Sequence, residues 1–406
     1  MGSFFSNCCK GDPADEVAFK KGSQSYDQYS TTHQLEDLHK AIRSFQECLD
    51  LRLEARKDLA AQRKPESRKF SEKIANTYLN LTMTLLLRYD KQPTLDNLQH
   101  LARVEPNLLK EWGTDHPQNY VSILCDAATA YKRGYIEATS QPPPSAFTPP
   151  NDSSTLNPTE LFSRAYTRFE QILKVQDGGT GMTSTMRGRA LSGLANLELL
   201  QYQGTRSAAS IYALDKAISH FKEASHSFSI LPEDRLLLRE CLDNLASAYY
   251  KHFEVDPARN HQDLNNSIFY YQYVRPQFDN IHHDHAEQTA WIKCSHHLAM
   301  ALYKRYEPSR PHSNQLGRQQ EGYVTVGNVD LTRSPKALED LRKAHEVEKE
   351  AKDVLDALGE NVISTLQLND VKPDVDKLWE VLAEHSAHAS VRSSRQPSPT
   401  PSSNTH

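Results

Sequence analysis

The fold is decided by a pattern whose clearest copy is LASAYYKHFE, residues 245–254. A small residue stands at 246, a bulky one at 249 and an aromatic one at 253. Offsets of three, four and seven residues place side chains on one stripe of an α-helix. The same spacing occurs at Thr82/Leu85/Tyr89, Ala128/Tyr131/Tyr135 and Ala299/Leu302/Tyr306. The sequence therefore predicts repeated amphipathic helices, each with one buried stripe.

A second pattern lies between copies of the first. It is a small residue, a large one four positions later and a smaller or apolar one three positions after that. Its copies are Ala41/Phe45/Cys48, Ala165/Phe169/Ile172, Ala217/Phe221/Ala224, Ser267/Tyr271/Val274 and Ala337/Leu341/Ala344. A small residue lets a partner helix approach closely, and the large one fills the adjoining groove. Helices of the two kinds should form antiparallel pairs that stack on one another.

These spacings resemble the tetratricopeptide repeat (TPR). Its first helix carries Leu-Gly/Ala-x-x-Tyr, as at Leu245, Ala246 and Tyr249, and its second carries Ala-x-x-x-Phe-x-x-Ala, as in the copy that begins at Ala217. The small residues of successive first helices are 46, 67, 51 and 53 positions apart, whereas the standard TPR period is 34. The elongated spacing resembles the degenerate TPR arrays of fungal proteins, some of which belong to immune-type receptors. The resemblance implies an all-α, right-handed α-solenoid of about six antiparallel helix pairs.

Changes in composition divide the chain. The segment 1–34 is polar after its first residues and is expected to be a lipidated tether or frayed helix, and the Pro-rich segment 141–158 is expected to be a loop. The Ser/Pro tail has the composition of a disordered segment. The expected organisation is a tether at 1–34, repeats at 35–140, a loop at 141–158, repeats at 159–386 with an insertion at 308–335, and a disordered tail at 387–406.

Bulk composition excludes several classes of protein. Hydrophobic residues make up 38% of the chain, which suits a solenoid better than one compact core. A net charge of −5 argues against a nucleic-acid surface, which needs clustered Lys and Arg. No apolar run reaches the roughly 18 residues of a membrane span. The six cysteines include no C-x-x-C, which indicates free thiols in a reducing compartment.

The first nine residues, MGSFFSNCC, carry two acylation signals. Gly2 with Ser6 fits the N-myristoylation pattern, and Cys8 and Cys9 follow as palmitoylation candidates. A myristoyl chain alone binds membranes weakly, so a second acyl group is needed for stable anchoring. We expect a peripheral protein on the cytoplasmic face of a membrane, with a possible cytosolic pool. The alternative is a chance match to a short pattern.

The TPR resemblance also implies a concave groove, lined by first helices, that binds a protein or peptide partner. Some members hold a peptide's C-terminal carboxylate with an Asn placed like Asn80 and Asn244. Lys251, Lys304 and Arg305 would make the mouth of the groove positive. The alternatives are an ordinary polar surface for the asparagines and favourable placement near helix C-termini for the cations.

Catalytic and metal-binding patterns are missing from the sequence. It contains no phosphate-binding loop, no H-E-x-x-H and no G-x-S-x-G. The histidines at 282–285 and 296–297 are expected to be surface residues, and Cys294 a core residue. The sequence predicts no enzyme, metal, cofactor, small-molecule substrate or nucleic-acid partner. Ser398 and Thr400, each followed by Pro, are phosphorylation candidates. Two alternatives stay open: a regulatory component of a fungal immune-type pathway, and an enzyme whose active site follows no known motif.

Overall fold

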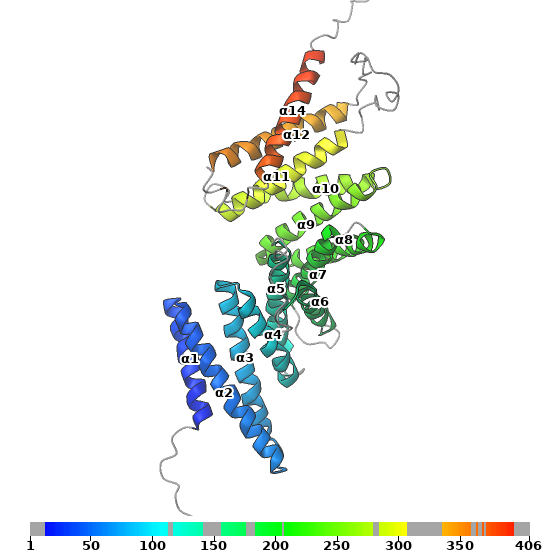
Figure 1. Ribbon diagram of the computed structural model, residues 1–406. Coiled ribbons are helices and arrows are strands. Elements are labelled where there is room, and N and C mark those ends of the chain that lie inside the picture. Colours follow the sequence, from blue (N-terminus) through cyan, green and yellow to red (C-terminus); the bar gives the residue numbers. More distant parts are fainter. Residues whose placement is uncertain are drawn as a thin grey trace, which may run out of the picture. The chain divides into compact units, whose positions relative to one another are not determined.

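The structure, a computed structural model, describes residues 13–112, 117–140, 156–175, 183–204, 207–278, 284–306, 335–358, 363, 368 and 371–393. Within these ranges the regular elements are helices, and no strand occurs (Figure 1). The predicted all-α class is confirmed. None of the helices in the described ranges combines the length and apolarity that a bilayer span requires.

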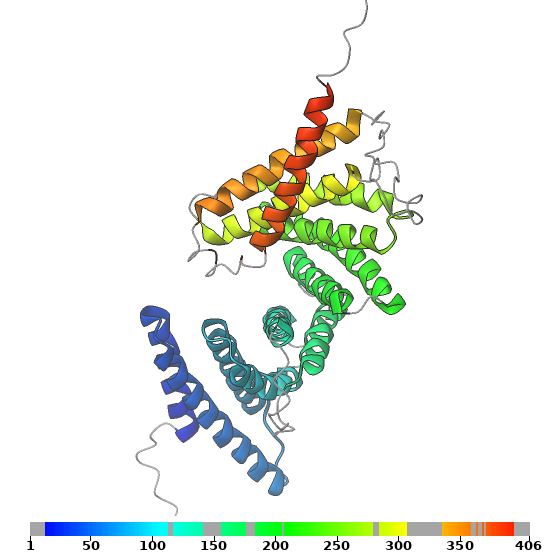
Figure 2. The same cartoon turned by 45° about the horizontal axis from the view of Figure 1, so that its top comes forward.

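The chain divides into two compact units, and the division falls within α7 (Ser184–Gly204) and near the end of α8 (Ala208–Phe228). In the first unit neighbouring helices pack in pairs, α1 with α2, α3 with α4 and α5 with α6, and the pairs follow one another (Figure 2). The bounds are α1 Ala14–Thr32, α2 Leu35–Ala61, α3 Arg68–Lys91, α4 Leu95–Trp112, α5 Pro117–Ser140 and α6 Pro158–Val175.

The second unit repeats this scheme. Helix α9 packs with α10, α11 with α12, and α14 covers α12. The bounds are η2 Pro232–Asp234, α9 Arg235–Val255, α10 His261–Val274, η3 Arg275–Gln277, α11 His285–Tyr306, α12 Pro335–Ala357 and α14 Val371–Ser393. With α7 and α8, the described residues contain twelve α-helices before α14, which is the number that the six predicted pairs require. The right-handed twist stays a prediction.

The core consists of the small and bulky residues of the two sequence patterns. Ala165 and Phe169 of α6 are buried, as are Ala246 and Tyr249 of α9. The closeness of the helices is clearest at Gly193 of α7, where an added Cβ would lie 2.3 Å from the Phe169 ring. Only a residue without a side chain allows this approach, so small residues set the spacing of the helices.

The segment expected as a tether contains a packed helix, which corrects the sequence-based expectation for residues 14–32. Helix α1 is polar overall, but Ala18, Gly22 and Tyr29 turn one buried face toward α2. An added Cβ at Gly22 would lie 2.7 Å from the ring of Phe45. The small residues of α1 therefore match the bulky stripe of α2.

A buried arginine holds the start of α1 in place. Arg52 of α2 is only 3% exposed and donates hydrogen bonds to Asp15 (3.0 Å) and Glu16 (3.1 Å) in the first turn of α1. It also donates to the Lys73 carbonyl (2.7 Å) and the Thr77 hydroxyl (2.6 Å) of α3. One guanidinium thus links three helices.

Two other boundaries differ from expectation. Helix α14 continues to Ser393, beyond the expected end of the repeats at 386. Helix α6 begins at Pro158, inside the expected loop, because Pro suits the first turn of a helix and the Asn157 side chain accepts the Glu160 amide proton at 2.8 Å. The Pro-rich residues 141–155, residues 307–334 of the insertion and residues 394–406 of the tail lie outside the described residues.

Candidate functional site

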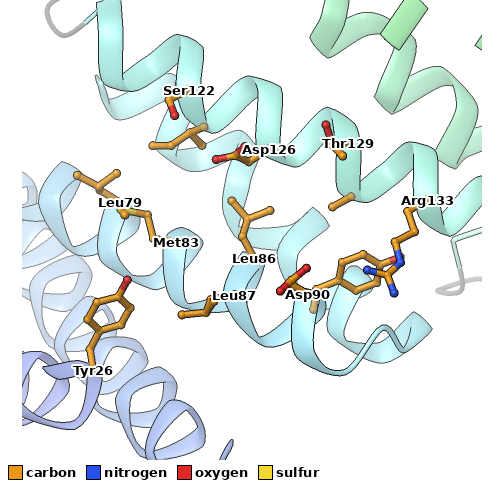
Figure 3. Close-up of a pocket in the computed structure, with 13 residues that line it drawn as sticks. Tyr26, Leu79, Met83, Leu86, Leu87, Asp90, Ser122, Asp126, Thr129 and Arg133 are labelled. Atoms are coloured by element: carbon orange, nitrogen blue, oxygen red, sulfur yellow. The ribbon is translucent and has the colours of Figure 1, made fainter. Parts of the chain in front are cut away.

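A hollow of about 640 Å³ lies within the first unit, where α1, α3 and α5 face one another (Figure 3). These are the first helices of three successive pairs, of which the sequence pattern marks α3 and α5 but not α1. Its lining residues are Tyr26, Leu79, Met83, Leu86, Leu87, Tyr89, Asp90, Ser122, Ile123, Asp126, Thr129, Ala130 and Arg133.

Helical periodicity explains how each helix contributes to this surface. On α3, Leu79, Met83 and Leu87 recur every four residues, two positions away from the buried residues Leu81 and Leu85 and on a different side of the helix. Helix α3 is therefore apolar on two sides, of which one packs in the core and the other faces the hollow. On this second side, Leu79 packs in part against the core, whereas Met83 is 45% exposed in the hollow.

The floor of the hollow is adaptable and open to solvent. Met83, near the middle of α3, is 45% exposed and presents an apolar side chain to solvent in the hollow. Figure 3 shows Tyr26 reaching from α1 toward Met83, with Leu86 of α3 and Asp126 of α5 opposite each other. Methionine is flexible and polarisable, and it is common on surfaces that accept varied apolar partners.

Charged side chains stand around this floor. The Asp126 carboxylate is half exposed and lies 3.6 Å from the Arg189 guanidinium. The surrounding protein raises the pKa of Asp126 by desolvation, and Arg189 opposes that shift. Arg133 donates to Glu137 at 3.0 Å, and its guanidinium lies 5.8 Å from the centre of the Tyr89 ring. The positive charge of Arg133 is thus already used by its own helix and by an aromatic neighbour.

The predicted carboxylate-binding residue of this unit points to a local role. Asn80 lies on α3 next to Leu79, and its side-chain nitrogen donates to the Asn76 carbonyl at 2.8 Å. A bond to the preceding turn competes with a bond to a ligand. The structure thus places Asn80 beside the hollow, with its amide N–H engaged in its own helix.

The other predicted peptide-binding residues belong to the second unit. Asn244 and Lys251 are half-buried on α9, and Lys304 and Arg305 lie in the last turn of α11. Arg305 donates two bonds to Asp340 of α12, at 2.6 and 2.8 Å, and a third to Asn265 of α10 at 3.0 Å. Its guanidinium connects helices, and peptide binding by it would compete with that connection.

The acylation candidates Gly2, Cys8 and Cys9 and the phosphorylation candidates Ser398 and Thr400 lie outside the described residues. These assignments stay predictions.

Cysteines and histidines of the described residues occupy structural positions. Cys48, Cys125, Cys241 and Cys294 are buried free thiols, and burial raises the pKa of each. The prediction that Cys294 is a core residue is confirmed.

His296, expected at the surface, is instead buried, and its Nδ1 lies 2.8 Å from Glu348 of α12, so for this residue the expectation is wrong. Its ring therefore serves the contact between α11 and α12. Among the described residues, no three His, Cys, Asp or Glu side chains are grouped as metal ligands would be.

The lining of the hollow differs from the predicted binding residues, although the sequence contains a signal for it. Leu79, Met83 and Leu87 repeat at intervals of four beside a stripe already assigned to the core. One helix rarely needs two apolar stripes unless a further surface covers the second. The residues selected instead were the polar ones that the TPR resemblance implies.

Comparison with known proteins gives structural similarities only. No protein-family model and no curated protein matches the chain. Among solved structures it is similar to BtubC (BKLC) from P. vanneervenii, with 13% identity and a TM-score of 0.37, over 86% of this chain and 93% of that one.

The chain is also similar to the S. pombe nuclear import adaptor Nro1 in two crystal forms. Identity is 12% and 11%, and the TM-scores are 0.38 and 0.41. The matches cover 87% and 94% of this chain and 99% and 100% of the Nro1 chains. With similarities this distant, the function is inferred from the chain's own residues.

Proposed function

We propose that this chain is a TPR-like adaptor that binds a protein partner in the hollow between α1, α3 and α5. In this proposal acyl groups on Gly2, Cys8 and Cys9 hold the adaptor on the cytoplasmic face of a membrane. The hollow selects the partner, and the anchor sets where the partner is recruited.

The observation that supports the adaptor is the apolar side of the hollow on α3, where Met83 is 45% exposed between partly buried leucines. Leu79, Met83 and Leu87 face a hollow bounded by two further helices, so a peptide segment placed there would contact three helices at once. Apolar side chains in such a concave surface lose water contact on binding, at about 25 cal/mol for each Å² buried. A groove formed by successive helix pairs is the usual binding surface of a helical solenoid.

Site-specific photo-crosslinking in cells tests the hollow. A photoreactive amino acid is placed at Met83 and, as a control, at Leu95, which is 44% exposed on α4 and does not line the hollow. We expect a partner adduct from position 83 that is absent from position 95. The same adducts from both positions, or none from position 83, would contradict binding in the hollow.

Metabolic labelling tests the anchor. Alkyne-tagged myristate and palmitate should both label the wild-type protein and place it in the membrane fraction. Gly2→Ala should lose both labels, because palmitoylation needs prior contact with the membrane. The double variant Cys8→Ser/Cys9→Ser should keep myristate and bind membranes only weakly. A wild-type protein without either label would remove the anchoring proposal and leave the hollow unaffected.

A further inference from the structure

We infer that the hollow selects a basic peptide, in which apolar side chains enter the floor formed by Leu79, Met83 and Leu87 while a neighbouring Lys or Arg pairs with Asp126 or Asp90. This inference rests on the proposed function and specifies the partner's chemistry. It also replaces the carboxylate-terminated peptide that the TPR resemblance implies for Asn80.

The distribution of charge in the hollow favours a cation. Asp126 and Asp90 come from different helices, α5 and α3, and both side chains are about half exposed or more. Asp126 meets Arg189 at 3.6 Å, and Asp90 meets its neighbour Lys91 at 3.2 Å. Such exposed pairs contribute little and are easily exchanged for a ligand's cation.

Among the described residues, the lining contains one cation, Arg133, and its pair with Glu137 is about as exposed as the pair of Asp126 with Arg189. Arg133 bonds to Glu137 and lies against the Tyr89 ring, so an incoming carboxylate would have to displace one of these contacts. That carboxylate would also approach Asp126 and Asp90, and like charges at an interface lower affinity. The described lining itself contains two carboxylates, Asp90 and Asp126, and one guanidinium, Arg133, so its net negative charge favours Lys and Arg over acidic segments.

The size of the apolar stripe sets the length of the segment. From Leu79 to Asp90, α3 advances by about 16 Å at 1.5 Å per residue. An extended peptide covers that distance with about five residues at roughly 3.3 Å each. One or two apolar side chains with a basic residue beside them fit this length.

Selection from a random peptide library tests the inference without knowledge of the natural partner. A phage-displayed library of 12-residue peptides is selected on the full chain, and binders are kept only if the uncharged substitution Met83→Asn abolishes their binding and Leu95→Asn does not. Lys and Arg should be enriched at least threefold over the starting library among these Met83-dependent peptides.

The possible failures are distinguishable. Recovery of no Met83-dependent peptide would contradict the proposed hollow itself. Met83-dependent peptides without a preference for Lys and Arg, or with enriched Asp and Glu, would overturn the basic-peptide inference alone.

Fluorescence anisotropy then assigns the charge preference to its residues. Replacing Lys and Arg of the strongest peptide by Gln should weaken its binding to the wild-type chain about tenfold, a loss that two half-exposed ion pairs can account for. The double variant Asp90→Asn/Asp126→Asn should bind both peptides with affinities within twofold of each other. If the double variant still discriminates tenfold, the two carboxylates are not the selecting groups.

Discussion

Replacing Arg52 by Met should loosen α1 from the rest of the first unit. The arginine joins Asp15 and Glu16 of α1 to the Thr77 hydroxyl and the Lys73 carbonyl of α3. Met keeps much of the apolar volume but provides no donor, so Asp15 loses its bond to Arg52, while Glu16 retains its bond to Lys73 at 2.6 Å. The rest of α1, including its contact at Gly22, is unchanged by this substitution.

The magnitude follows from the burial of the three groups. Breaking a fully buried ion pair costs about 3–5 kcal/mol because a buried charge is left unpaired. Asp15 and Glu16 are 22% and 26% exposed, so water compensates part of their loss. We therefore expect α1 to lose about 2–3 kcal/mol of local stability, which corresponds to a roughly 30- to 150-fold fall in amide protection.

Hydrogen exchange followed by mass spectrometry measures this effect locally, which matters because the chain has two units and need not unfold in one step. Peptides covering residues 14–32 should exchange faster in Arg52→Met. The control is Arg43→Met on the same helix, where the arginine is exposed and pairs only with Glu36 at 3.1 Å. Equal protection of α1 in the wild type and Arg52→Met would refute the assigned role of this guanidinium.

Three further predictions concern other contacts. Gly193→Ala should lower the thermal unfolding midpoint seen by circular dichroism and destabilise the chain by about 1–2 kcal/mol, because overlap with Phe169 outweighs the better helix propensity of Ala; a raised midpoint would contradict this. Burial raises the pKa of Asp243 to about 6 from 3.8, so the folded chain holds this proton more tightly than the unfolded chain, and the resulting stability is lost as pH rises through 6. The free energy of unfolding, measured in urea, should therefore fall by at most about 3 kcal/mol between pH 4 and pH 7, and Asp243→Asn should remove this fall. If the free energy of unfolding of the variant depends on pH as it does in the wild type, Asp243 is not the group responsible. Arg305→Lys should speed amide exchange in α12 through a loss of about 1–2 kcal/mol, since Lys cannot make two parallel bonds to Asp340; exchange at the wild-type rate would show that the paired bonds contribute little.

Much of the fold could be predicted because helical packing leaves a short-range pattern in the sequence. The copies at Thr82 and Ala246 place small and bulky residues within seven positions of one another, and the structure buries both small residues. Helix α4 gave a weaker signal because Pro106 interrupts its sequence, although the helix continues from Leu95 to Trp112.

Helix α1 could not be recognised in the same way because its stability depends on distant residues. Its buried face contains Gly22 and few large apolar side chains, which alone would predict a weak helix. The missing stabilisation comes from Phe45 and from Arg52, which lies 36 positions from Glu16. No local pattern reports a contact over that separation.

The lining of the hollow could not be read from the sequence. The repeat pattern marks α3 and α5 as first helices, but α1, which contributes Tyr26, lacks that pattern. The side chains that face the hollow are those outside the buried side of each helix. The neighbouring helices determine which side of a helix is buried. Met83 and Asp126 therefore become recognisable only when α3 and α5 are placed side by side.

The burial of the four described cysteines has a practical consequence for the N-terminus. Thiol reagents attack the thiolate, and Cys48, Cys125, Cys241 and Cys294 combine raised pKa values with closed surroundings. Brief maleimide treatment of the native protein should therefore spare all four, which leaves the pair at positions 8 and 9 to take up reagent. The increase in intact-protein mass would then give the number of cysteines in that pair that carry no acyl group.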